Sequence, residues 1–128
     1  MIKKARAVLN EWMLAVNRGD LERLLALYSE TAVLIPTFSN RLLNHPDKIR
    51  DYFATLGSRE ELSIALHEKT VIVQPLKSEL CSLSGIYCWR FLLDGELLSF
   101  EARFSYVLDL ASARPIVQHH SSQIPRVL

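Results

Sequence analysis

A chain of 128 residues has the usual size of one domain, and 49% of its residues are hydrophobic. Fifteen basic and fourteen acidic residues leave a formal net charge of +1 and form no basic block, which argues against a nucleic-acid partner. A high apolar content with a net charge near zero favours burial of part of the surface against a second copy of the chain.

The first helix is predicted from Ile2, whose apolar partners recur at helical spacing as far as Val16. Gly19 should end this helix, because glycine accepts the left-handed conformation just past a helix end. Asp20 can then cap a second helix, which we expect from Leu21 to Ser29. The first two helices should therefore form a tight hairpin.

A short strand is expected at Thr31–Thr37, at an edge or ending at Pro36, which has no amide hydrogen. A loop follows, and Asn44, His45 and Pro46 open a third helix. Proline is harmless in the first turn of a helix, where the amide hydrogens have no partner. Gly57 should end this helix.

Everything after Gly57 is predicted to be extended, as four strands: Leu62 to Gln74, Leu80 to Leu93, Leu97 to Leu110 and Arg114 to Ile124. We expect Pro75 to break the first strand and Asp94-Gly95 to form a tight hairpin turn, because both of its central positions need positive φ. Gly85 is a candidate β-bulge. Strands about twice the usual five or six residues twist and coil. The sequence thus predicts an α+β fold over 1–128, with three N-terminal helices packed into a strongly curved, mostly antiparallel sheet around a central pocket.

The sequence further predicts a cytoplasmic protein without a membrane span. Cys81 and Cys88 lie on one extended segment, about 23 Å apart and on opposite faces, so they cannot bridge each other. The basic N-terminal stretch is interrupted by Asn10 and Glu11, unlike a signal peptide. No apolar run approaches the length of a membrane-spanning helix.

The third predicted strand alternates cleanly between an apolar row and a polar row that contains Glu101 and Arg103. The pattern alone favours a polar row that faces water. Glu101 could act as a base only if Arg103 does not pair with it, because a neighbouring guanidinium would lower its pKa.

The order of elements and four strings, NRGDLERLLALYSETAVLIPTFSNR, HPDKIRDYF, SFEARFSYV and IVQHHSSQIP, resemble a known superfamily over essentially the whole chain. This is the nuclear transport factor 2-like superfamily of cystatin-like α+β cones. The strings are similar to its bacterial SnoaL-like branch and to the association domain of calcium/calmodulin-dependent protein kinase II. The resemblance implies homodimers or higher homo-oligomers, packed through the outer faces of their sheets, and a pocket inside each cone.

The resemblance also implies a set of pocket residues. Arg103 matches a pocket arginine of the association domain, with Glu101 beside it. Ser121 and Cys88 stand where that domain has two further arginines, with Arg90 as a substitute for the second; these departures put a shared ligand in doubt. If a second subunit covers the apolar row, Glu101 and Arg103 line the cavity, and a carboxylate ligand could pair with the guanidinium.

His119 shares a strand face with Ser121 and is the candidate catalytic residue, since histidine is the commonest general acid–base group. The alternatives are a hydrogen-bonded structural histidine and a histidine at a subunit interface. Trp12, Tyr28 and Phe53 are candidates for the pocket wall, although aromatic residues at such spacing are more often plain core. Thr37 is placed near the pocket mouth by the resemblance alone. The four histidines lack the spacing of a metal site, and no cofactor motif is present.

Two functions remain open from the sequence. The first is a small-molecule-binding or oligomerisation domain, with small organic acids as the expected ligands. The alternative is an isomerase, cyclase or dehydratase like SnoaL or ketosteroid isomerase, with a pocket histidine or carboxylate as acid–base. Fold alone does not decide whether the protein is an enzyme.

Overall fold

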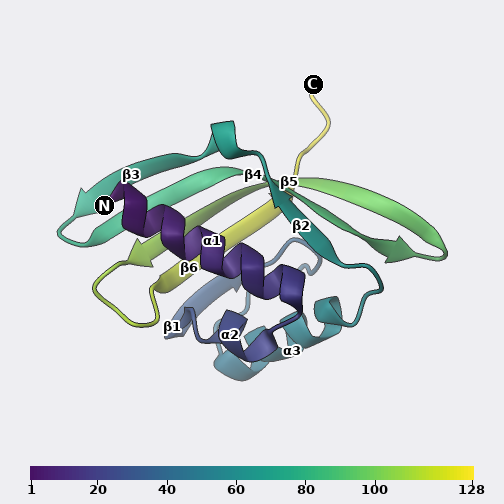
Figure 1. Ribbon diagram of the computed structural model, residues 1–128, viewed down its shortest axis with the longest axis horizontal. Helices are drawn as coiled ribbons and strands as arrows, with labels where there is room; N and C mark the ends of the chain where they lie inside the picture. Colours follow the sequence, from purple (N-terminus) through teal and green to yellow (C-terminus); the bar gives the residue numbers. More distant parts are fainter.

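The computed structural model describes all of residues 1–128 and combines three N-terminal helices with one six-stranded mixed sheet (Figure 1). The helices are α1 (Ile2–Arg18), α2 (Leu21–Leu25) and α3 (Pro46–Gly57), with a 3-10 turn η1 (Glu68–Thr70). The strands are β1 (Tyr28–Ile35), β2 (Ser63–Leu66), β3 (Ile72–Lys77), β4 (Leu80–Leu93), β5 (Glu96–Asp109) and β6 (Ile116–Gln123). The predicted α+β class with three N-terminal helices is confirmed.

The strands follow the order β1-β6-β5-β4-β2, and β3 pairs with the first half of β4. β1 and β6 run parallel, whereas every other pair is antiparallel. The parallel pair brings β1, early in the chain, beside β6 near its end. β6 in turn pairs with β5, which forms an antiparallel pair with β4.

The predicted helical hairpin is present, but its second helix is shorter than expected. Gly19 adopts φ 66°, and the Asp20 carboxylate accepts a hydrogen bond from the amide of Arg23 at 3.1 Å. α2 ends at Leu25 rather than Ser29. The physical reason is competition from the sheet, because the carbonyl of Leu27 accepts from the amide of Ile116 in β6 at 2.9 Å.

The predicted single strand from Leu62 to Gln74 is wrong, because η1 divides it into β2 and β3. At the break, the Thr70 hydroxyl accepts from the amide of Ile86 in β4 at 2.9 Å and so replaces a bond of the sheet ladder. Pro75 does not end the strand but lies inside β3. β3 pairs on one side only, with β4, so the missing amide hydrogen of the proline is tolerated.

β4 and β5 form a long hairpin in unbroken register from Leu80–Asp109 to Leu93–Glu96. Its turn confirms the prediction, since Asp94 has φ 51° and Gly95 has φ 81°. The β-bulge expected at Gly85 is absent, because the register runs straight through that position. Gly85 instead lies against the ring of Phe104, where there is no room for a side chain.

The core lies where α1 crosses one face of the sheet (Figure 1). Trp12 of α1 has no exposed surface and stacks on Tyr87 of β4, with ring centroids 5.6 Å apart. The alternate residues of β5, which include Phe104 and Tyr106, complete one buried hydrophobic cluster. No helix of the chain is both long enough and apolar enough to cross a membrane.

Candidate functional site

His119 lies at the centre of the core, and both of its ring nitrogens have hydrogen-bond partners. The hydroxyl of Tyr28 is 2.8 Å from Nδ1, and the hydroxyl of Tyr87 is 3.1 Å from Nε2. Trp12 donates from its indole nitrogen to the Tyr28 hydroxyl at 3.0 Å. Tyr106 stacks on the imidazole, with ring centroids 4.0 Å apart. Three predicted site residues, Trp12, Tyr28 and His119, therefore meet in one network.

Burial lowers the pKa of His119 from 6.5 to about 3, with a smaller contribution from the neighbouring His120. The imidazole is therefore neutral near pH 7, so one nitrogen donates and the other accepts. The Tyr28 hydroxyl already accepts from Trp12, and its own proton has no other acceptor than Nδ1. These contacts fit a tautomer in which Tyr28 donates to Nδ1 and Nε2 donates to Tyr87.

Thr37 and Ser121, two further predicted site residues, share a hydrogen bond between their hydroxyls. Ser121 is buried in β6, on the same face as His119, and Thr37 follows β1. Phe53 of α3 is buried against Tyr28, with ring centroids 5.7 Å apart. The hydroxyls of Thr37 and Ser121 are therefore occupied with each other, and Phe53 packs against the core around His119.

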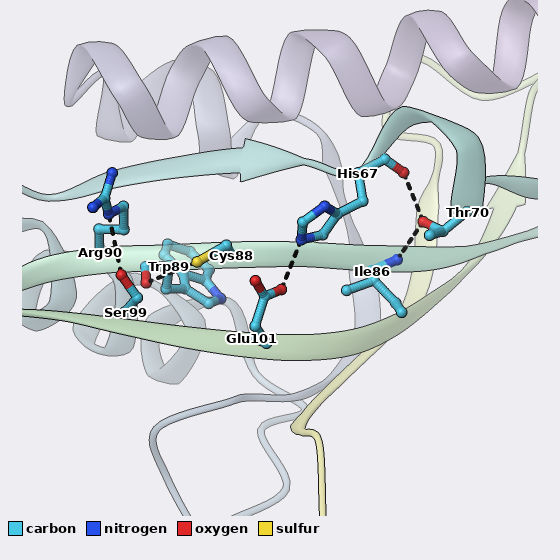
Figure 2. A network of polar contacts seen from close by, with 8 residues as sticks. All are labelled: His67, Thr70, Ile86, Cys88, Trp89, Arg90, Ser99 and Glu101. Atoms are coloured by element: carbon cyan, nitrogen blue, oxygen red, sulfur yellow. Dashed lines mark hydrogen bonds and ion pairs between the residues drawn. The ribbon is translucent and has the colours of Figure 1, made fainter.

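Glu101 and Arg103 are placed on the outer face of β5, which corrects the prediction that they line the pocket. Both are exposed, whereas Ala102 and Phe104 between and beside them face the core. Successive side chains of a strand point to opposite faces, so Glu101 and Arg103 cannot face the core when Ala102 and Phe104 do. Glu101 forms an ion pair across the sheet with His67, at 2.8 Å, and Figure 2 shows these two side chains. Glu101 forms no ion pair with Arg103. The polar row therefore faces outward, as the alternation pattern alone favoured.

Two apolar cavities lie beside the third helix. The first, which we call the helical cleft, has a volume of about 280 Å³ between the α1–α2 junction, α3 and β4. Its lining includes Val16, Leu21, Leu24, Phe53, Leu56 and Trp89. The second, the hairpin cavity, has a volume of about 300 Å³ between α3 and the end of the β4–β5 hairpin. Its lining includes Phe38, Tyr52, Leu56, Arg59, Phe91 and Phe100. His119 lines neither cavity.

Arg59 is the one charged residue in the lining of the hairpin cavity. Its guanidinium carbon lies 5.9 Å from the centre of the Phe91 ring. The four ion pairs of the chain are Arg6–Glu68, Arg23–Glu11, Arg50–Glu22 and His67–Glu101, so Arg59 has no carboxylate partner. A cation over an aromatic ring beside an apolar space can receive an anionic ligand.

Tyr52 gives the hairpin cavity a second polar group. Its hydroxyl accepts from the amide of Phe38 at 3.2 Å, and its own proton has no acceptor within the chain. Burial raises the pKa of Tyr52 to about 12, so the hydroxyl keeps that proton at neutral pH. Arg59 and Tyr52 therefore both bring donors to the lining of a space with aromatic walls.

Arg59 and Phe38 were not among the predicted site residues. No pattern in the sequence marks Arg59, which lies just beyond the end of the third helix at Gly57. Nothing in the sequence shows that Phe38 meets the hairpin, since that contact depends on the tertiary fold. No group of three or more His, Cys, Asp or Glu side chains is arranged to hold a metal ion.

The solved structures that share this fold include the following three. A protein from Xanthomonas campestris, provisionally assigned as a calcium/calmodulin-dependent protein kinase II association domain, is 23% identical, with TM-score 0.87 over 99% of this chain and 90% of that chain. A provisionally assigned dehydratase of the NTF2-like family from Streptomyces avermitilis is 14% identical, with TM-score 0.82 over 98% and 97%. A provisionally assigned scytalone dehydratase from Novosphingobium aromaticivorans is 7% identical, with TM-score 0.83 over 97% and 84%.

At these identities the solved structures establish the fold alone. A comparison with curated proteins finds no match. The model of the SnoaL-like domain family, however, matches residues 5–126, which is nearly the whole chain. This match confirms the resemblance of the sequence strings: the chain belongs to the SnoaL-like domain family, within the nuclear transport factor 2-like, cystatin-like fold.

Proposed function

We propose that the protein is a small-molecule-binding domain that holds an organic acid in the hairpin cavity, at the edge of the curved-sheet cone that the family resemblance implies. The observation that carries this proposal is the unpaired guanidinium of Arg59 beside an apolar space. The sequence had suggested an acid ligand on Arg103. The proposed ligand is still an organic acid, but the arginine proposed to bind it is Arg59 instead of Arg103.

The chemistry of the cavity suits a carboxylate with an apolar body. Arg59 supplies charge and paired donors, and a guanidinium binds a carboxylate through two parallel hydrogen bonds. Tyr52 can donate a third. The rings of Phe38, Phe91 and Phe100 pack edge to face or stacked, with centroids 5.1 to 5.3 Å apart, and form an aromatic wall for the body of the ligand.

The alternative, an enzyme of the isomerase, cyclase or dehydratase type, has less support. His119 was its candidate acid–base, and a general base must reach the proton that it removes. Both nitrogens of His119 are already bonded to tyrosines, and the pKa of about 3 leaves the imidazole a weak base at neutral pH. Its observed contacts fit the structural histidine that the sequence left open.

Arg59→Gln is expected to weaken binding of phenylacetate by about tenfold to a hundredfold, which is the usual value of a hydrogen bond to a charged group. Isothermal titration calorimetry with both proteins at neutral pH measures this change. The matched control is Arg103→Gln, which removes a guanidinium from the outer face of the sheet, away from the hairpin cavity, and should leave the affinity unchanged. Equal binding by wild type and Arg59→Gln would show that the acid site lies elsewhere.

We further propose a homodimer in which the outer face of the sheet meets its copy. The centre of that face carries the half-buried side chains Ile86, Cys88 and Val107, beside serines and the charged residues Glu101 and Arg103. Light scattering after size exclusion should give about twice the chain mass of 14.6 kDa at micromolar concentration. Ile86→Lys should shift this mass toward one chain, whereas Leu14→Lys, on the half-exposed side of α1, should not. A monomeric wild type would contradict the proposal.

A further inference from the structure

The hairpin cavity and the helical cleft share one lining residue. Leu56 lines both cavities and is 7% exposed. On the sheet side, Trp89 of the cleft packs edge-on against Phe38 of the hairpin cavity, with ring centroids 6.0 Å apart. Leu56 and the contact between Trp89 and Phe38 therefore form a common boundary of the two spaces.

The two cavities differ in charge in a way that would orient a ligand. The hairpin cavity carries the cation Arg59, whereas the one charged residue of the cleft is the carboxylate Asp20. Asp20 is held by the amide of Arg23, at the start of α2. An anionic group is therefore favoured in the hairpin cavity and opposed in the cleft, where most of the lining is hydrophobic.

From this arrangement we infer that the two cavities form one bipartite site for an acid with an extended apolar tail, such as a medium-chain carboxylate. The carboxylate lies at Arg59, and the tail passes Leu56 beside Trp89 into the helical cleft. The inference rests on the proposed function, because it needs the acid site to position the head group. It adds a ligand class: acids whose tails are longer than the hairpin cavity alone can hold.

A chain-length series tests the inference. Butanoate, hexanoate, octanoate and decanoate are titrated calorimetrically into wild type, and the affinity should rise about threefold to fourfold for each methylene that enters the cleft. Ala54→Phe places a ring from the exposed side of α3 into the cleft lining. This variant should bind butanoate as wild type does, but should lose the gain for octanoate and decanoate. Ala7→Phe, on α1 and outside both cavities, should behave as wild type.

The outcomes separate the two proposals. If no acid binds to wild type, the proposed function is wrong, and the bipartite site is wrong with it. If short acids bind through Arg59 but the affinity does not rise with tail length, the acid site stands and the tail compartment is wrong. A rise that is equal in wild type and Ala54→Phe also overturns the tail compartment, because the tail then packs somewhere other than the cleft.

Discussion

Acidification from pH 7 to pH 4.5 is expected to remove about 2 to 3 kcal/mol of unfolding free energy through His119 alone. The imidazole has an ordinary pKa of 6.5 in the unfolded chain and a pKa of about 3 in the folded protein, where burial opposes its charge. Protons therefore bind the unfolded chain more readily than the folded protein. Stability falls by about 1.4 kcal/mol for each pH unit below 6.5 and levels off near pH 3.

His119→Gln tests this expectation, because glutamine offers both a donor and an acceptor to Tyr28 and Tyr87 but does not titrate. The variant should be less stable at pH 7, since it loses the stacking on Tyr106. Urea unfolding between pH 7 and pH 4.5 should show this deficit shrinking as the pH falls. His120→Gln removes the neighbouring exposed imidazole and should keep most of the acid sensitivity of wild type. Parallel pH profiles for wild type and His119→Gln would contradict the argument.

The parts of the fold that the sequence predicted well are those fixed by local chemistry. Gly19 and Asp20 set the helical junction, and Asp94-Gly95 set the hairpin, through backbone conformations that only a few residues favour. The division of Leu62–Gln74 into two strands was missed because it depends on a contact with β4. The hydroxyl of Thr70 takes the place of a ladder acceptor for Ile86, sixteen residues away.

The candidate site was predicted only in part, and the reason lies in the two faces of a strand. The alternation around Glu101 and Arg103 correctly separated two rows, but the expectation of a pocket put the polar row inside. The apolar row already contained Phe104 and Tyr106, whose large aromatic side chains favour burial in the core. The alternation pattern of the strand therefore placed Glu101 and Arg103 correctly, whereas the pocket positions taken from the association domain did not.

The network around His119 shows a different limit. Tyr28, Tyr87 and His119 come from β1, β4 and β6, and no spacing along the chain relates them. They meet because the parallel pairing of β1 with β6 aligns Leu34 with His119, and because β5 lies between β6 and β4. Such a network depends on sheet order, which the sequence did not supply.

Gly85→Ala is expected to destabilise the protein by about 1 to 3 kcal/mol, the usual cost of overpacking a well-filled core. A Cβ at this position would lie 2.9 Å from Cζ of Phe104 and 3.2 Å from the hydroxyl of Thr70. Neither neighbour can move freely. The Phe104 ring stacks on Tyr87 with centroids 4.4 Å apart, and the Thr70 hydroxyl donates to the carbonyl of His67 while accepting from an amide.

Alanine normally stabilises a strand relative to glycine by roughly 0.5 to 1 kcal/mol, so the sign of the measured change decides whether the close contact dominates. The matched control is Gly57→Ala, at the end of α3, where an added Cβ meets nothing within 4 Å. That variant should be neutral or slightly stabilising. Phe104→Leu in the Gly85→Ala background should recover part of the loss, because the two sites share one space and their effects should not add. A Gly85→Ala protein as stable as wild type in urea would show that the Phe104 ring yields, and that the hairpin tolerates a side chain at its centre.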